Sequence, residues 1–145
     1  MPDKMPNWAK KFGYGEFVHL EQRNCKACMM KGDKVFREVE DNCFDVSLRQ
    51  KEMDETGVTM QVLSTIPVLF NYWAKPKDGL ETSRYLNDHI ANSVIKFPER
   101  FMGIGTVPLQ DVDMAIAEME RCVAALKMPG LEIGSTLNGA NLSDE

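Results

Sequence analysis

The chain has 145 residues, 43% of them hydrophobic, and its 17 Lys and Arg against 22 Asp and Glu give a formal net charge of −5. This size allows one moderate hydrophobic core but not two, and the negative charge argues against a nucleic-acid binder, which needs a basic face. No apolar run approaches the roughly 20 residues that cross a bilayer. Because residues 1–11 also lack the apolar core of a secretory signal, we expect a cytosolic protein with no membrane and no nucleic-acid partner.

The first 44 residues predict an irregular lead-in and a small β-hairpin. Residues 17–20 are predicted to start a short strand, and residues 34–39 alternate apolar and polar side chains. Between them, residues 24–33 are cationic and end in a turn signal at Gly32. We therefore expect the two runs to pair as an antiparallel hairpin that is added to the main fold.

Residues 58–68 form the stretch around which the rest of the chain is organised. They are rich in apolar and β-branched side chains, which favours a strand buried on both faces. A short buried helix is the competing interpretation, but the short run and its breakers Gly57 and Pro67 favour a strand. Before this strand, Asp45 as N-cap and the stop at Gly57 predict a helix of about three turns.

A loop and a long helix are predicted after the central strand. The loop holds an aromatic cluster that includes Phe70, Tyr72 and Trp73. A helix is predicted over 80–97 because Pro98 ends it and one side of it is apolar. That side consists of Tyr85, Leu86, Ile90, Val94 and Ile95.

Two more strands and another helix complete the predicted pattern. Residues 101–109 predict a strand, and Gly103 and Gly105 within it indicate that another segment packs closely there. A helix follows Asp111, and residues 130–134 begin a third strand. The helix has one apolar face, made of Ala115, Met119, Cys122 and Leu126.

These elements predict an α/β protein with about three βα units over 45–145 and the hairpin-bearing lead-in over 1–44. In such folds the functional side chains lie where the strands end. No helix is predicted to cover the third strand, and stable domains avoid such open sheet edges. We therefore expect residues 1–145 to be one incomplete domain of a larger protein.

Several segments, in the same order along the chain, carry a resemblance to a known family. They are Lys10-Lys11-Phe12-Gly13-Tyr14-Gly15, Asp33-Lys34-Val35-Phe36-Arg37, Leu63-Ser64-Thr65-Ile66-Pro67-Val68, Tyr72-Trp73-Ala74-Lys75-Pro76 and Glu118-Met119-Glu120-Arg121-Cys122-Val123. The sequence thus resembles the amidohydrolase-related metal-dependent decarboxylases over nearly its whole length. The resemblance implies a partial (β/α)₈ TIM-type barrel, with this chain as the N-terminal portion lacking the first strand.

The resemblance also implies an activity for the full-length parent. That activity is the non-oxidative decarboxylation of a small dicarboxylate semialdehyde in the kynurenine route of tryptophan catabolism, which limits quinolinate and NAD formation. A divalent metal, usually zinc, generates the hydroxide in this family, and the parent is implied to be a homodimer. The family's His-x-His ligands would lie before Met1 and the other ligands after Glu145. We therefore expect neither a metal nor a catalytic residue in this chain alone.

Three residues are candidates for substrate binding. Arg37 matches the family's arginine that binds a substrate carboxylate, and a planar guanidinium suits bidentate binding. By pattern alone, an arginine on an alternating strand would be a solvated charge. Trp73 and Phe70 follow the carboxyl end of a strand, where barrel active sites lie. For both of them, apolar cover for a loop is the alternative.

The cysteines are predicted to be free thiols. Cys25 and Cys28 have the spacing of a metal knuckle or a redox pair, but no second such pair exists, and Cys43 and Cys122 are isolated. A chain with no export signal is expected to keep its thiols reduced.

Other polar residues receive a structural interpretation. His19, in a predicted strand, and His89, in a predicted helix, match no ligand of the family. Glu118 and Glu120 are expected to be surface charges. Their spacing of two residues puts them about 200° apart around a helix, so they are not expected to act as a pair.

Two functional interpretations remain open. In the first, the chain is a fragment or isoform of the decarboxylase, and the parent performs the chemistry. In the second, it is a catalytically inactive short product that pairs with or interferes with the full-length enzyme. A related decarboxylase that acts on an aromatic acid is a third, weaker option.

Overall fold

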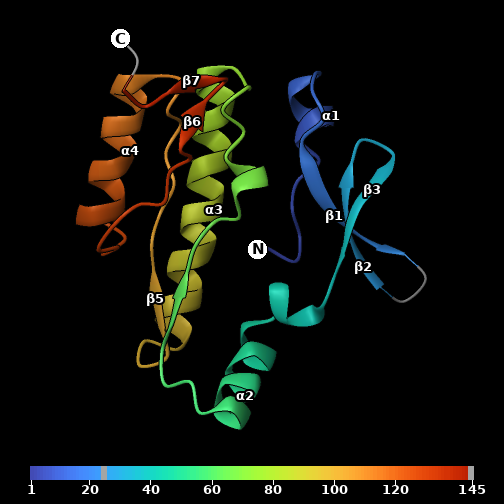
Figure 1. Ribbon diagram of the computed structural model, residues 1–145, viewed down its shortest axis with the longest axis vertical. Helices are drawn as coiled ribbons and strands as arrows, with labels where there is room; N and C mark the ends of the chain where they lie inside the picture. Colours follow the sequence, from blue (N-terminus) through green and yellow to red (C-terminus); the bar gives the residue numbers. More distant parts are fainter. Residues whose placement is uncertain (24–25, 144–145) are drawn as a thin grey trace. The chain divides into compact units, whose positions relative to one another are not determined.

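A computed structural model describes residues 1–23 and 26–143 (Figure 1). The residues group into two compact units, Met1–Thr59 and Met60–Glu145, called here the N-terminal and C-terminal units. The N-terminal unit contains α1 (Trp8–Phe12), β1 (Val18–Arg23), β2 (Lys26–Lys31), β3 (Lys34–Val39), the 3₁₀ helix η1 (Asp41–Cys43) and α2 (Val46–Thr56). The C-terminal unit contains β4 (Gln61–Leu63), the 3₁₀ helix η2 (Pro67–Leu69), α3 (Pro76–Lys96), β5 (Phe101–Gly103), α4 (Val112–Ala124), β6 (Thr136–Leu137) and β7 (Ala140–Asn141). This grouping places α2 in the same unit as the N-terminal sheet, whereas the sequence analysis groups it with the βα units of 45–145. That residues 1–145 form one incomplete domain stays a prediction.

The N-terminal sheet has three antiparallel strands in the order β1-β2-β3, so the predicted two-stranded hairpin is wrong. The segment expected to be a cationic loop contains the central strand, β2. Val18 of β1 lies opposite Lys31, and Lys31 lies opposite Lys34 of β3. Lys26 and Lys31 flank a short apolar run, residues 27–30, and all four side chains of that run are buried. Because charged residues flank this apolar run, the sequence pattern did not predict it as a strand.

The helices of this unit begin and end at identifiable residues. The lead-in, expected to be irregular, contains α1, whose Trp8 ring stacks on Phe12 with centroids 5.5 Å apart. The predicted N-cap of α2 is confirmed, because the Asp45 carboxylate accepts from the Ser47 N–H at 2.8 Å. Gly57 ends α2 with φ of +72°, a left-handed conformation that glycine adopts without a steric cost.

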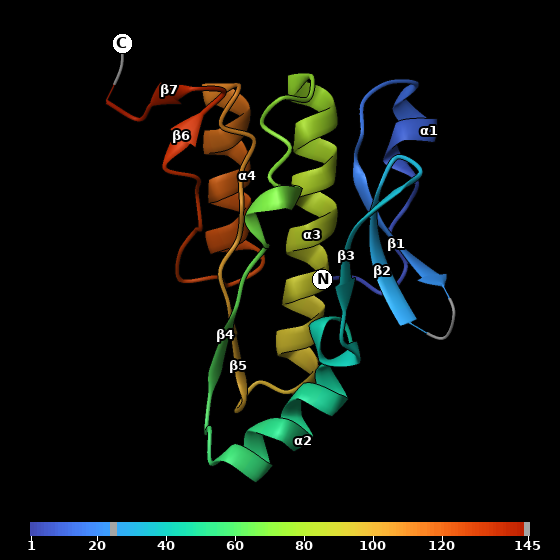
Figure 2. The same cartoon turned by 45° about the vertical axis from the view of Figure 1, so that its right-hand side comes forward.

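The C-terminal unit is a β-α-β-α-β run, which confirms the predicted α/β class. β4 and β5 pair in parallel, with Leu63 opposite Gly103, and they run side by side next to α3 in Figure 2. The predicted third strand forms only an isolated parallel bridge between Gly105 and Leu131. β4, β5 and the segment bridged at Leu131 therefore lie in chain order and run parallel to one another.

The central strand is shorter and more exposed than expected. Within 58–68, the strand β4 is only three residues long, and the same range runs into the 3₁₀ helix η2. Leu63 packs against the core, but Met60 and Val62 are 48% and 56% exposed, so the predicted burial on both faces is wrong. Leu63 lies on the face of this sheet that α3 and α4 cover, whereas Val62 lies on the opposite face.

The core of the C-terminal unit lies between the sheet and its two helices. Its buried members and the side chains packed on them are Ile90, Ala91, Cys122, Met128, Leu63, Leu126 and Leu131. A Cβ on Gly103 would lie 2.7 Å from Ile90 Cγ2, and one on Gly105 would lie 2.8 Å from Cys122 Sγ. The predicted close approach at both glycines is confirmed.

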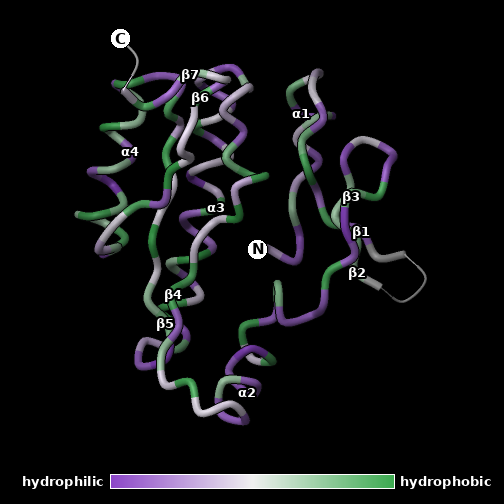
Figure 3. The backbone as a smooth tube through the Cα atoms, viewed as in Figure 1, coloured by the Kyte–Doolittle hydropathy of each residue, from purple (hydrophilic) through white to green (hydrophobic). Residues whose placement is uncertain are grey.

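The buried faces of α3 and α4 differ in part from the predicted ones. Leu86 and Ile90 are buried as expected, but Ile95 is 74% exposed. On α4, Met119 is 40% exposed, whereas Glu118 is fully buried. Figure 3 shows hydrophilic and hydrophobic residues interspersed along both helices. Among the described residues, no helix combines the length and the apolar character needed to cross a membrane.

A small hairpin, formed by β6 and β7, follows Gly134. Thr136 pairs with Asn141, and Leu137 pairs with Ala140. Asn138 and Gly139, which connect the two strands, have φ of +50° and +92°. An Asn-Gly pair favours such a turn, because both residues tolerate positive φ.

Candidate functional site

The candidate site is the carboxyl edge of the parallel sheet, defined here as Thr65, Thr106 and Gly134. These residues follow β4, β5 and the bridge at Leu131. In parallel α/β sheets, ligands bind at the carboxyl ends of the strands, because loops of several units converge there. Thr65 and Thr106 are buried, with 4% and 0% of their surface exposed.

The aromatic loop that follows β4 reaches this edge. Phe70 is buried and stacks on Tyr72, with centroids 5.3 Å apart. The Tyr72 hydroxyl accepts from the Gly134 N–H at 3.1 Å. Trp73, by contrast, is 47% exposed. Of the two aromatic candidates, the structure therefore places Phe70 in the packed interior of its unit and leaves a large part of the Trp73 ring accessible.

Tyr72 is the residue of this loop that sequence reasoning passed over. Burial raises the pKa of Tyr72, the hydrogen bond from the Gly134 N–H lowers it, the Glu132 carboxylate raises it further, and the nearby Thr106 side chain lowers it. The phenol therefore stays protonated near neutral pH, and its hydrogen bond joins the loop after β4 to Gly134. Its position inside an aromatic cluster was the only sequence signal.

Asn87 of α3 holds the backbone at the end of β5. Its Nδ2 donates to the Thr106 carbonyl at 2.9 Å, and its Oδ1 accepts from the Thr106 N–H at 2.8 Å. Asn87 is fully buried. One side chain thus satisfies both polar groups of a buried peptide residue, as a neighbouring strand would.

Glu118 of α4 completes this arrangement, and its predicted role as a surface charge is wrong. Its Oε1 accepts from Asn87 Nδ2 and from Arg121 Nη2, both at 2.8 Å. Its Oε2 accepts from Arg84 Nε at 3.0 Å and from Arg121 Nε at 2.8 Å. Arg121 Nη1 also donates to Asp88 at 2.7 Å. These five residues are called the Glu118 cluster.

The charges of the Glu118 cluster set its protonation states. Burial alone would raise the pKa of Glu118, but hydrogen bonds from Arg121, Asn87 and Arg84 outweigh it and lower the pKa. Burial, and then the neighbouring Glu118 charge, raise the pKa of Cys122 to about 12. The carboxylate is therefore ionised and the thiol neutral at pH 7. A polar Asn87 on the buried side of a helix was the signal that could have revealed the cluster.

This cluster predicts how stability depends on pH. The pKa of Glu118 is lower in the folded protein than in the unfolded chain. The stabilising effect of the ionised carboxylate is therefore complete above the unfolded pKa of about 4.3, and it is lost as pH falls through the folded pKa. We expect the free energy of unfolding to drop more between pH 6 and pH 3 in the unmodified chain than in E118Q. Urea titrations at both pH values measure this, and equal drops would contradict the assignment.

Arg37, the third candidate, belongs to the N-terminal unit. It lies on β3 opposite Met29 of β2, and its side chain is exposed. β3 is exposed along most of its length. Phe70 and Trp73 belong to the C-terminal unit.

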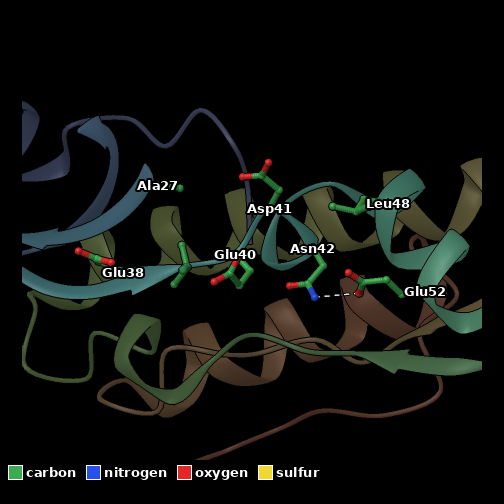
Figure 4. A pocket seen from close by; sticks show the side chains of 8 residues that line it. Ala27, Glu38, Glu40, Asp41, Asn42, Leu48 and Glu52 are labelled. Carbon is green, nitrogen blue, oxygen red and sulfur yellow. Dashed lines mark hydrogen bonds between the residues drawn. The ribbon is translucent and has the colours of Figure 1, made fainter. Parts of the chain in front are cut away.

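The N-terminal unit also contains an acidic pocket of about 310 Å³ (Figure 4). It lies where the end of β3 meets η1 and α2, and Asn42 Nδ2 donates there to Glu52 at 2.8 Å. Its lining consists of Ala27, Glu38, Val39, Glu40, Asp41, Asn42, Leu48 and Glu52. The carboxylates do not converge: in residues 1–23 and 26–143, no group of three His, Cys, Asp or Glu could hold a metal. The described residues therefore do not fit the divalent metal that the resemblance implies.

The remaining candidate ligands are separate from one another. Cys28 is buried as a free thiol, and Cys25 lies outside the described residues. His19 in β1 contacts Glu21 at 3.0 Å, and His89 is half-buried on α3.

Comparison with known proteins gives the relatives of this chain. No family model matches the sequence. The chain is 48% identical over 145 residues to the 2-amino-3-carboxymuconate-6-semialdehyde decarboxylase of Dictyostelium discoideum, covering 99% of this chain and 40% of the relative. It is 36% identical to the enzyme of that name from Caenorhabditis elegans, covering 93% of this chain and 39% of the relative.

Solved structures agree with these relatives. A 5-carboxyvanillate decarboxylase from Novosphingobium aromaticivorans, crystallised with manganese, superposes with a TM-score of 0.67 and 28% identity, over 70% of this chain and 29% of that one. The chain spans about two fifths of the length of the curated relatives it matches. The chain is therefore a homologue of part of 2-amino-3-carboxymuconate-6-semialdehyde decarboxylase.

Proposed function

We propose that this chain contributes part of a metal-dependent, non-oxidative decarboxylase that converts 2-amino-3-carboxymuconate-6-semialdehyde to 2-aminomuconate semialdehyde. The observation that carries the proposal is 48% identity along 99% of the chain to a curated decarboxylase of that specificity. In this proposal the whole protein acts in tryptophan catabolism in the cytosol, works as a homodimer and limits quinolinate and NAD formation. The alternative of an inactive product that interferes with the full-length enzyme gains no support from the comparisons.

We further propose that the parallel sheet is part of a closed (β/α)₈ barrel. The exposed face of the sheet carries Val62 and Met102, which are 56% and 40% exposed. Burying such side chains against further strands is favourable, by roughly 25 cal/mol for each Å² of apolar surface removed from water. Barrel closure would also remove the open edges of β4 and β5.

The outer side of α4 supports the same proposal. A stripe of four exposed apolar residues runs along it, each between 40% and 70% exposed, with spacings of four, three and four. The stripe consists of Val112, Ile116, Met119 and Val123. At 100° per residue it lies about 90° from the buried face that holds Ala115, Glu118 and Cys122. A further βα unit that packs against this side would bury the stripe.

For the substrate, we propose that the exposed guanidinium of Arg37 binds one carboxylate and that the accessible ring of Trp73 lines the site. Phe70 is buried, and it would act by supporting Tyr72 through their stacked rings. A guanidinium forms paired hydrogen bonds to a carboxylate that a lysine ammonium cannot reproduce. A divalent metal would supply activated water in the whole enzyme, held by residues other than the described ones.

A chimeric enzyme tests the proposed function. The chain would replace the matching segment of the Dictyostelium relative, and decarboxylation of the semialdehyde and metal content would be measured. We expect the chimera to be active and to bind metal. Arg37→Ala should lower kcat/KM by about tenfold to a hundredfold with unchanged metal content, because a hydrogen bond to a charged group contributes about 1.5–3 kcal/mol.

Two controls complete this experiment. Lys34→Ala removes another exposed cation of β3 and should leave kcat/KM within about twofold, since it changes only a solvated charge. A folded, metal-loaded chimera without activity would overturn the proposed function. Normal kinetics of the Arg37→Ala chimera would remove that arginine from the site.

A further inference from the structure

We infer that Asn87 and Glu118 are positioning residues for the carboxyl edge, holding the Thr106 peptide in place beside the Tyr72 phenol. The inference rests on the proposed function only in that the carboxyl edge is the side where substrate would bind. Neither residue belongs to the sequence-based candidates, and neither is exposed: both have 0% of their surface accessible. They act through Thr106 rather than by touching a substrate.

The first step is the two-point attachment of Thr106. The hydrogen bonds of 2.9 Å and 2.8 Å from Asn87 fix both the carbonyl and the N–H of this residue. β5 ends at Gly103, and no strand pairing is present at Thr106. Gly105, the residue before Thr106, is held by the parallel bridge to Leu131, and its N–H donates to the Gly130 carbonyl at 3.0 Å. At Thr106 the attachment to α3 takes the place of the strand pairing that ends at Gly105.

The second step is the orientation of the Asn87 amide. An ionised carboxylate has no proton to donate, so Glu118 Oε1, 2.8 Å away, requires that Nδ2 and not Oδ1 faces it. With Nδ2 on that side, Oδ1 is left to accept from the Thr106 N–H. Glu118 thus selects one of two amide orientations, and Arg84 and Arg121 hold the carboxylate in place.

The third step carries this order to Tyr72. The Thr106 side chain lies beside the Tyr72 phenol and lowers its pKa, and the same phenol accepts from the Gly134 N–H at 3.1 Å. The Thr106 hydroxyl itself is buried and has no hydrogen-bond partner among the described residues. A displaced Thr106 would therefore change the surroundings of the Tyr72 phenol. An ion cluster that only joined α3 to α4 would not have this effect.

A donor–acceptor exchange tests the inference in the intact 145-residue chain. Asn87→Asp places a second acceptor against Glu118 and also removes the donor to the Thr106 carbonyl. Glu118→Gln in the same chain restores a donor between the two side chains. Amide hydrogen exchange at Thr106 and the NMR signals of the Tyr72 ring are the readouts. We expect Thr106 exchange to rise by about tenfold or more in N87D, because a charge-assisted hydrogen bond is replaced by repulsion. In N87D/E118Q the Thr106 exchange should slow by at least about threefold relative to N87D, because residue 87 regains a donor from residue 118, although the Thr106 carbonyl does not. The Tyr72 signals should shift back toward their original positions.

Asp88→Asn is the matched control, because it changes only the exposed end of the Glu118 cluster at Arg121. Thr106 exchange and the Tyr72 signals should be unaltered in this variant. Should N87D not fold, E118Q alone is measured. Relative to the unmodified chain, we expect exchange to increase more at Thr106 than at core amides of α4. Equal changes at all amides, or no recovery in the double variant, would overturn the inference. An inactive chimera with the expected Thr106 response would instead refute the proposed function alone.

Discussion

Replacing Glu118 by alanine is expected to lower the free energy of unfolding by about 3 kcal/mol, the lower end of the range for breaking a buried ion pair. The Glu118 carboxylate is fully buried and accepts hydrogen bonds from three side chains, so its removal leaves donors without an acceptor. The lower end applies because the Arg84 side chain is 50% exposed and can be hydrated, whereas that of Arg121 is 26% exposed. Urea unfolding followed by circular dichroism measures the change.

Glu120→Ala provides the control for this variant. Glu120 lies on the same helix, two residues further along, and is exposed. Its removal should change the free energy of unfolding by no more than about 0.5 kcal/mol, as is usual at surface positions. Similar losses in the two variants would mean that Glu118 contributes only as a helix residue and not through its contacts.

Gly105→Ala is expected to destabilise the C-terminal unit by about 1–3 kcal/mol, the usual cost of an overpacked core. The new Cβ would lie 2.8 Å from Cys122 Sγ and 3.1 Å from Leu131 Cδ2, so the core has to shift. Thermal or urea unfolding measures the loss. In a Cys122→Ala background the same substitution should cost less, because the nearest sulfur is absent.

Gly130→Ala is the matched control for the glycine prediction. The nearest atom to a Cβ at this position is Ile104 Cγ2, 3.9 Å away, and Gly130 does not have a positive φ. This variant should be neutral or slightly stabilising, since alanine restricts the unfolded chain more than glycine does. If both alanine variants had equal stability, the close approach at Gly105 would not limit the packing.

Local signals were sufficient to predict many elements of this protein. Asp45 and Gly57 begin and end α2 through contacts with their own neighbours in the chain. Gly103 and Gly105 were predicted to mark close packing, and both lie against side chains of the helices. Such features depend on a few adjacent residues, or on the absence of a side chain, and a sequence displays them directly.

The errors concern residues whose neighbours are distant in sequence. The Glu118 carboxylate is buried because Arg84 and Asn87, more than 30 residues earlier, meet it across the interface of α3 and α4. β2 is the centre of its sheet because strands pair with it on both sides. Helical spacing alone assigned Met119 to the core and Glu118 to the surface, the reverse of what packing produces.

The sequence by itself determined the α/β class, the alternation of strands and helices, and the resemblance to decarboxylases, because apolar periodicity, helix caps and collinear motifs are properties of the chain. Only the tertiary structure decided that Tyr72, Thr106 and Gly134 meet at one edge, with Asn87 and Glu118 behind them. The physical reason is that hydrogen bonding and the cost of burying charge depend on which groups face each other, and the fold sets those partners.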